Sequence, residues 1–398
     1  MLRKTLSFIS VLLLAATVAG AQNPDDGTAR PRSVGVVMSG GGAKGLYHIG
    51  VLEALEENGV PIDYVAGTSM GSIIAAMYAA GYSPAQMREI VASGVVKEWV
   101  SGRIDPRYTP YYQQIGHNPS FISVRLNLGN SGKRFRVTNL ISSTPIEMAL
   151  TELFAPASAA AGGDFDRLMV PFLCVSSDMN AREPVVMRNG DLCEAVRSSM
   201  SIPLVFKPMK VDSMLLYDGG IYDNFPWRPL DVGFRPDLIV GSICTAGNTP
   251  PGEDINILDQ AFMLAMHDTD YDLPKGRSVT VRRAVDVNML DFDSAVAVMD
   301  AGYEDAMAVM PQILERVSER WSPRRYAERR EEFRAKCPPL VFNDYKLEGL
   351  SSAPEAYIRD FVQVDRRTPG RQLAQSRTSL RIRYLDYVEN QAEWLLFG

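Results

Sequence analysis

The chain of 398 residues is 46% hydrophobic and 22% charged, as globular proteins are, which excludes disordered, collagenous and polytopic membrane classes. Its formal charge of −6 offers no basic surface for nucleic acid, so we expect no nucleic-acid partner. Four cysteines are too few for a disulfide scaffold. Three histidines restrict any metal or catalytic site that depends on imidazole.

The N-terminus has the pattern of a secretory signal peptide. Basic residues precede the apolar run 6–18, and residues 19–21 (Ala-Gly-Ala) fit the small-residue pattern of a cleavage site. The alternative, an uncleaved membrane anchor, would need about 20 apolar residues to span a bilayer. We therefore expect residues 1–21 to be removed during export to the periplasm, the outer membrane or the cell surface. Residues 22–32 are polar and are expected to form a flexible linker.

Predicted strands and helices alternate from residue 34 onward. The apolar runs 34–38 and 62–66 predict buried strands, and apolar residues at helical spacing predict helices over 43–58 and 70–80. This alternation predicts an α/β fold with a mainly parallel sheet covered by helices. Further strands are predicted at 171–175, 215–217 and 238–243, and further helices at 191–200, 257–267 and 293–317. Cys174 and Cys244 fall in predicted core strands, where we expect buried thiols.

The first chemical motif is Gly67-Thr-Ser69-Met-Gly71, between a predicted strand and a predicted helix. A serine on such a turn exposes its hydroxyl at the carboxyl end of the sheet, and glycines at both flanks allow the tight backbone. The dipole of the helix that follows favours negative charge near the serine. Ser69 is therefore predicted to be a nucleophile, although chance turns also produce this pattern.

The second motif is Gly40-Gly41-Gly42-Ala-Lys44-Gly45, again between a strand and a helix. Consecutive glycines expose backbone N–H groups to an anion. The spacing also fits a dinucleotide site, which would need an acidic residue about 20 positions later. Ala66 and Gly67 stand there instead. An oxyanion hole beside Ser69 is therefore the favoured interpretation.

A serine nucleophile also needs a base, and the histidines are poor candidates. His267 alone follows a plausible acid, as in the Ser, acid, His order of α/β-hydrolases, but it lies in a helical pattern without turn signals. His48 is expected to be structural, and His117 lies in a polar loop with no specific signal. The scarcity of histidine favours a carboxylate base.

Asp218 is a candidate for this carboxylate base. It follows the predicted strand 215–217 and precedes Gly219 and Gly220, which allow a close approach to Ser69. The alternative is a simple β-turn, because Asp-Gly is a common turn pair.

Three further blocks, taken with the glycine loop and the serine turn, resemble the patatin-like phospholipases. They are residues 45–52 (Gly-Leu-Tyr-His-Ile-Gly-Val-Leu), 195–203 (Ala-Val-Arg-Ser-Ser-Met-Ser-Ile-Pro) and 218–226 (Asp-Gly-Gly-Ile-Tyr-Asp-Asn-Phe-Pro). The resemblance covers roughly residues 33–315 in the expected order. It implies a Ser–Asp dyad with Ser69 as nucleophile, Asp218 as base and Gly40 to Gly42 as oxyanion donors. Lys44 stands where the family has Arg or Lys.

The resemblance also implies a three-layer α/β/α domain, which we place at residues 33–336. The implied activity is that of a phospholipase A-type serine lipid acyl hydrolase acting on phospholipids or a membrane surface, without a cofactor, a metal or calcium. A general esterase, an acyltransferase with the same dyad and a non-catalytic lipid-binding envelope adaptor are the alternatives.

The C-terminal part is expected to be a separate small α+β tail. Cys337-Pro338-Pro339 marks the boundary, and residues 337–398 weakly resemble the start of a POTRA module, which implies association with an outer membrane. Before the boundary, residues 320–336 carry seven Lys or Arg and three Glu in a helical pattern. This segment is interpreted as a solvated helix face, with a membrane-surface contact as the alternative.

Overall fold

The computed structural model describes residues 32–102, 141–248 and 257–339. The predicted signal peptide and nearly all of the predicted linker and C-terminal tail lie outside the described residues, as does His117. Among the described residues, no helix has both the length and the apolar character needed to cross a bilayer.

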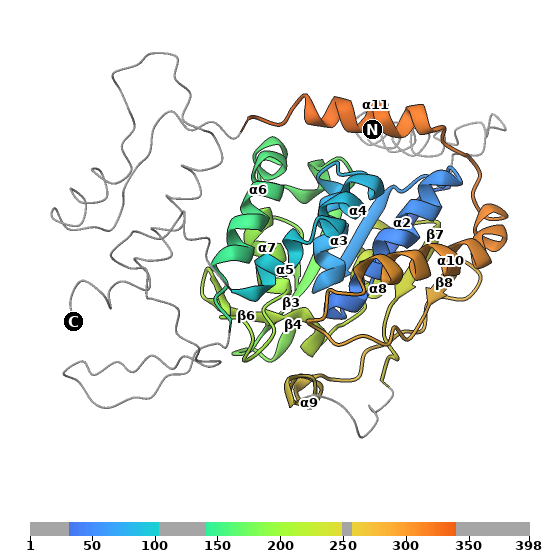
Figure 1. Cartoon of the computed structure of the whole chain (residues 1–398). Coiled ribbons are helices and arrows are strands. Elements are labelled where there is room, and N and C mark those ends of the chain that lie inside the picture. Colours follow the sequence, from blue (N-terminus) through green and yellow to red (C-terminus); the bar gives the residue numbers. More distant parts are fainter. Residues whose placement is uncertain (1–31, 103–140, 249–256, 340–398) are drawn as a thin grey trace, which may run out of the picture. The chain divides into compact units, whose positions relative to one another are not determined.

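An eight-stranded sheet forms the centre of the domain (Figure 1). Strands β3, β2, β1, β7 and β8 are parallel, whereas β4 and β6 are antiparallel to β3, and β5 is antiparallel to β6. The strands are β1 (Val34–Met38), β2 (Tyr64–Thr68), β3 (Phe172–Asp178), β4 (Glu183–Met187), β5 (Met209–Val211), β6 (Met214–Asp218), β7 (Leu238–Ile243) and β8 (Ser278–Arg282). The predicted mixed α/β fold with a mainly parallel sheet is confirmed.

Helices cover both faces of this sheet. The α-helices are α2 (Tyr47–Glu57), α3 (Met70–Ala79), α4 (Pro84–Ala92), α5 (Val95–Ser101), α6 (Thr144–Ala161), α7 (Leu192–Ser199), α8 (Trp227–Phe234), α9 (Ile257–Ala265), α10 (Ala295–Leu314) and α11 (Pro323–Arg334). Short 3-10 helices are η1 (Gly42–Leu46), η4 (Phe165–Arg167) and η5 (Gly219–Ile221). Val36 and Met38 of β1 join the large core under α2, α3 and α10, whereas Val37 joins a smaller core with Leu230 of α8. Alternate residues of β1 therefore enter two different cores, as in a three-layer α/β/α arrangement.

Glycines set the close packing of α2 against α10. A Cβ atom on Gly50 would lie 1.9 Å from the carbonyl oxygen of Met299, and one on Gly302 would lie 2.0 Å from that of Tyr47. Each helix therefore uses a glycine where the backbone of the other approaches it. This contact holds α2, and with it the glycine loop that precedes α2, against the domain.

The basic segment before residue 337 has the predicted solvated face, on which five of its seven basic residues are exposed, but two arginines of α11 contact the domain. Arg329 donates to the carbonyl oxygens of Ile62 and Met169 at 3.0 and 2.8 Å, and the largely buried Arg330 pairs with Glu56. Ile62 and Met169 precede β2 and β3, so α11 fastens to the amino-terminal side of the sheet. These partners come from loops far away in the sequence, which is why the charge pattern alone did not reveal them.

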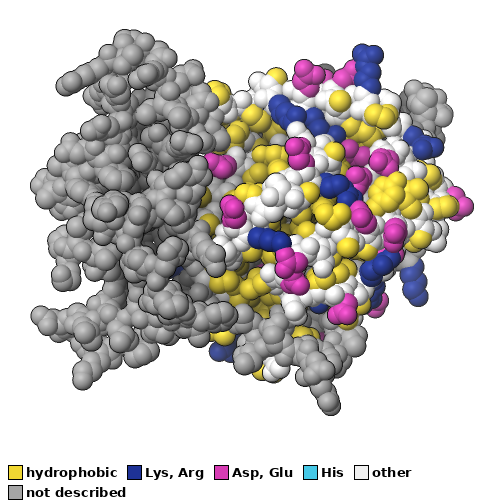
Figure 2. Space-filling model, in the orientation of Figure 1, with side chains coloured by type: hydrophobic (Ala, Val, Ile, Leu, Met, Phe, Trp, Pro, Cys, Tyr) yellow, Lys and Arg dark blue, Asp and Glu magenta, His cyan; other side chains and the backbone are white. Residues whose placement is uncertain are grey.

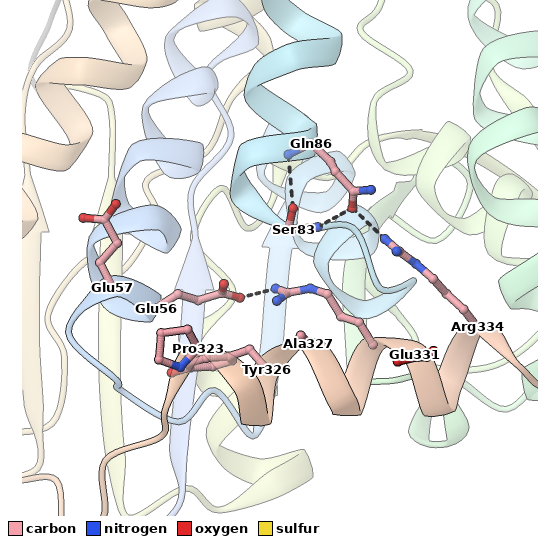
Figure 3. A pocket seen from close by; sticks show the side chains of 10 residues that line it. Glu56, Glu57, Ser83, Gln86, Pro323, Tyr326, Ala327, Glu331 and Arg334 are labelled. Carbon is pink, nitrogen blue, oxygen red and sulfur yellow. Dashed lines mark hydrogen bonds and ion pairs between the residues drawn. The ribbon is translucent and has the colours of Figure 1, made fainter.

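Beside α11 lies an open groove with a volume of about 640 Å³ (Figure 3). Its lining includes Glu56, Gln86 and Arg334, and Arg334 donates to Gln86 at 2.6 Å. The groove lies near the start of β2, whereas Ser69 follows the end of that strand. On the face shown in Figure 2, acidic and basic side chains of the described residues are interspersed.

The substitution Gly50→Ala tests the contact between α2 and α10. The added methyl group would meet backbone atoms that cannot rotate away, so we expect the free energy of unfolding to fall by about 3 kcal/mol. Gly233→Ala in α8 is the matched control, because its nearest neighbour would be the flexible end of Arg188. Urea unfolding measures both variants, and equal losses of stability would contradict the close-approach argument.

Candidate active site

Ser69 occupies a strained turn between β2 and α3. Its backbone has φ 53° and ψ −123°, a conformation that residues with a Cβ rarely adopt. The glycines on either side make the turn possible: a Cβ atom on Gly67 would lie 2.3 Å from the carbonyl oxygen of Gly71, and one on Gly71 would lie 2.5 Å from that of Met38. The predicted sharp strand-to-helix turn is therefore present, with Ser69 at its tip.

The register of three strands brings Asp218 to Ser69. Thr68 at the end of β2 pairs with Val175 of β3, and Asp218 at the end of β6 pairs with the next residue, Ser176. Strand β4 pairs with residues 174–178 of β3, and these include residues that also pair with β2 and residues that also pair with β6. Strand β4 therefore lies on the opposite edge of β3 from β2 and β6. Strands β2 and β6 therefore meet end to end along one edge. The residue after Thr68 must then lie beside Asp218.

The two side chains form a short, buried hydrogen bond. The Ser69 hydroxyl donates to Oδ2 of Asp218 at 2.7 Å, and Ser69 is 5% exposed whereas Asp218 is fully buried. Oδ1 of Asp218 accepts the backbone N–H of Gly220 at 2.8 Å. Gly219 is required as well, because a Cβ atom there would lie 2.1 Å from the carbonyl oxygen of Val175. The Asp-Gly-Gly motif is therefore part of this site.

Burial controls the acidity of Asp218. Desolvation raises the pKa of its carboxyl group to about 7, although the hydrogen bonds from Ser69 and Gly220 act in the opposite direction. A carboxylate with a pKa near 7 is a better proton acceptor than an ordinary aspartate.

The glycine loop reaches the same place, but its three predicted donors are not equivalent. A Cβ atom on Gly40 would lie 3.2 Å from the Cβ of Ser69, so this part of the loop borders the serine. The Gly40 N–H donates to the carbonyl oxygen of Asn224 at 3.0 Å, which corrects its predicted role as an oxyanion donor. Within the described part of the chain, the N–H groups of Gly41 and Gly42 have no acceptor.

The other two residues of this motif differ in their surroundings. Gly45 packs against Met70 at the start of α3, where a Cβ atom would lie 2.5 Å from the Met70 Cγ. Lys44 lies in η1, and it forms no ion pair with any described residue.

One contact at the serine was missed by the sequence interpretation. The hydroxyl of Ser199, the last residue of α7, accepts the backbone N–H of Ser69 at 3.1 Å and donates to the carbonyl oxygen of Val175 at 2.6 Å. Ser199 therefore links the strained turn to β3. The Ser-Ser-Met-Ser run in block 195–203 was the available signal, but nothing in the sequence separates Ser199 from its neighbours.

The described histidines do not take part in the serine contact. His48 is fully buried and bonds to Ser242 and to the carbonyl oxygen of Ser39; burial lowers its pKa to about 4. The backbone N–H of His267 donates to Ile221, and its ring packs against Tyr222 with centroids 4.8 Å apart. Neither imidazole is hydrogen-bonded to Asp218.

Metal ligation and disulfides contribute nothing to the site as described. No group of three or more His, Cys, Asp or Glu residues within the described ranges could hold a metal ion. None of the four cysteines forms a disulfide bond, and Cys174, Cys193 and Cys244 are buried.

The raised pKa of Asp218 predicts a pH-dependent stability. An unfolded aspartate ionises near pH 4, so between there and pH 7 the folded state keeps a proton that the unfolded state has lost. The penalty for burying this carboxylate therefore grows as the pH rises and is complete above pH 7. Relative to wild type, Asp218→Asn should gain about 3 kcal/mol of unfolding free energy between pH 5 and pH 8, as measured by urea unfolding. A difference that does not change with pH would contradict this assignment.

Comparison with known proteins finds a family match and several relatives for part of this chain. The patatin-like phospholipase family matches residues 36–231. An uncharacterized NTE family protein of Mycobacterium tuberculosis is 28% identical over 228 residues, 57% of this chain and 53% of the relative, so the chain spans about half the length of that protein. A lysophospholipase of Cryptococcus neoformans is 30% identical over 220 residues, covering 55% of this chain and 12% of the fungal protein.

Among solved structures, VipD of Legionella pneumophila covers 71% of this chain and 67% of its own, with 14% identity and a TM-score of 0.40. The matched range 36–231 contains the glycine loop, the serine turn and the Asp-Gly-Gly motif. Residues 36–231 form a patatin-like phospholipase domain.

Proposed function

We propose that this protein is a serine lipid acyl hydrolase in which Ser69 is the nucleophile and Asp218 is the general base. The observation that carries the proposal is the 2.7 Å hydrogen bond from the Ser69 hydroxyl to a fully buried carboxylate. Hydrogen bonding between a nucleophile and its base is the signature of an activated serine. The patatin-like phospholipase domain supports lipid esters as the substrate class.

In the proposed reaction, Oγ of Ser69 attacks the ester carbonyl carbon while its proton moves to Oδ2 of Asp218. The N–H groups of Gly41 and Gly42 stabilise the oxyanion of the tetrahedral adduct. Asp218 then returns the proton to the departing alcohol, which leaves an acyl group on Ser69. Finally a water molecule gives a proton to Asp218 as it attacks the acyl carbonyl, and Asp218 returns that proton to Oγ of Ser69 as the fatty acid is released.

Phospholipids or lysophospholipids are the proposed substrates, with phospholipase A-type cleavage at the acyl ester. A fungal relative that is 30% identical carries the name lysophospholipase, which supports this substrate class. A general esterase or an acyltransferase would use the same residues, and product analysis separates them by showing whether the acyl group passes to water or to another acceptor. Export directed by residues 1–21 and outer-membrane association through residues 337–398 stay predictions from the sequence.

Single substitutions test the dyad. Ser69→Ala removes the nucleophile and Asp218→Asn removes the base, so each should lower kcat for phospholipid hydrolysis by at least about a thousandfold. Ser177→Ala is the matched control, because this buried serine has no hydrogen-bond partner for its hydroxyl among the described residues. Fatty-acid release by purified protein measures the effect, with circular dichroism to confirm folding. Normal turnover in either folded dyad variant would disprove the proposal.

The pH dependence of hydrolysis provides a second test. Only ionised Asp218 can accept the serine proton, and its pKa is raised to about 7 by burial. We therefore expect kcat/KM to rise with pH through a single ionisation near pH 7 and then to level off. Steady-state kinetics on a soluble ester between pH 5 and pH 9 measures the profile. A rate that stays constant down to pH 5 would exclude a base of this acidity.

A further inference from the structure

The peptide unit that leads into the glycine loop is held at both of its polar ends. The carbonyl oxygen of Ser39 accepts a hydrogen bond from Nε2 of His48 at 2.8 Å. The N–H of the same peptide unit, which belongs to Gly40, donates to the carbonyl oxygen of Asn224 at 3.0 Å. A planar peptide that is fixed at both ends cannot rotate about the chain axis. The backbone therefore enters the loop in one orientation.

The protonation of His48 follows from its two partners. A backbone carbonyl can only accept, so Nε2 of the ring carries the hydrogen. Nδ1 then accepts from the hydroxyl of Ser242, which lies 2.7 Å away on β7. His48 is fully buried, and burial lowers its pKa to about 4, which keeps the ring neutral in this arrangement. The ring thus connects α2, β7 and the start of the loop.

The next peptide unit, between Gly40 and Gly41, is held by the thiol of Cys244. Oγ of Ser39 accepts the backbone N–H of Cys244 at 3.2 Å and lies 3.4 Å from Sγ of Cys244, so its own hydrogen is available to the sulfur. The thiol hydrogen of Cys244 in turn donates to the carbonyl oxygen of Gly40, at 3.5 Å. Burial raises the pKa of this thiol to about 11, so the hydrogen stays in place.

The direction of the Gly41 N–H follows from this contact. The peptide bonds of residues 32–102 are all trans, and in a trans peptide the C=O and N–H groups point in opposite directions. The carbonyl of Gly40 points towards Cys244, so the N–H of Gly41 points away from it. A Cβ on Gly40 would lie 3.2 Å from the Cβ of Ser69, so the loop borders the serine there, whereas the space at Gly41 facing Cys244 is filled: a Cβ there would lie 2.7 Å from Sγ.

We propose that His48 and Cys244 are positioning residues that aim the Gly41 N–H at the oxyanion formed on Ser69. Neither side chain touches the substrate; each acts on a peptide unit of the loop. The inference rests on the proposed function, since it concerns the donor for that reaction. Preorganised donors accelerate a reaction because they need no reorientation as charge develops, so a loosened loop should slow the chemical step more than it weakens substrate binding.

The decisive comparison uses two buried thiols. Cys244→Ala removes the donor to the Gly40 carbonyl, whereas Cys193→Ala removes a thiol that donates to the carbonyl oxygen of Leu150, away from the loop. For hydrolysis of p-nitrophenyl butyrate we expect Cys244→Ala to lower kcat about tenfold with KM within about twofold, and Cys193→Ala to keep kcat within about twofold. Equal effects on kcat in both folded variants would overturn the proposal.

Rescue separates hydrogen bonding from packing. Cys244→Ser retains a donor and should recover most of the lost kcat, whereas Cys244→Val fills the space without a donor and should be as slow as the alanine variant. The same reasoning predicts that His48→Gln, which can still donate to Ser39, exceeds His48→Leu. If Cys244→Ala does not fold, the comparison of kcat between Cys244→Ser and Cys244→Val tests the proposal in its place. Serine and valine variants with the same kcat would contradict a donor role.

The outcome is distinguishable from failure of the proposed function. If wild-type protein hydrolyses no ester, or if Ser69→Ala is fully active, the dyad itself is wrong and so is this inference. If Ser69 is essential but the Cys244 and Cys193 variants have equal kcat, the dyad stands and the inference alone is wrong.

Discussion

The hydrogen bond between Ser69 and the buried carboxylate of Asp218 is the contact on which the arrangement of this domain depends. It exists because β2 and β6 end at neighbouring residues of β3, one arriving parallel and the other antiparallel. The serine turn adds backbone strain, which the glycines at 67 and 71 make sterically possible. The helices stacked above the sheet hold these strand ends in position, so the packing of the core and the chemistry of the site depend on the same register.

Electrostatics explains why the site can work without a histidine base. Desolvation raises the pKa of Asp218, whereas the hydrogen bonds from Ser69 and Gly220 limit that rise by stabilising the carboxylate. The balance leaves a carboxyl group that titrates near neutral pH. On the side of the glycine loop, backbone N–H groups border Ser69, and the neutral ring of His48 lies behind them. Negative charge on a reacting ester would therefore meet aligned dipoles. Burial thus serves both the proposed base and the proposed oxyanion site.

Local patterns and the family resemblance made much of the fold and the contact between Ser69 and Asp218 predictable. The run 34–38 is β1 as observed, and the serine turn was identified because strand, turn and helix follow each other directly in the chain, whereas Asp218 was assigned through the family resemblance. Long-range partners were not predictable. The Gly40 N–H is occupied by Asn224, Ser199 supports Ser69 from another helix, and Arg329 binds loops more than a hundred residues away. Each of these depends on which segments the sheet brings together, and residue type alone does not specify that choice.

The most direct test of the central claim is to locate the reactive nucleophile itself. Purified protein would be treated with a fluorophosphonate, digested and sequenced by tandem mass spectrometry. The account predicts a phosphonyl group on Ser69 alone, formed at least tenfold more slowly when Asp218 is replaced by asparagine. A modified residue elsewhere, or full phospholipid hydrolysis by protein whose Ser69 is completely blocked, would contradict it.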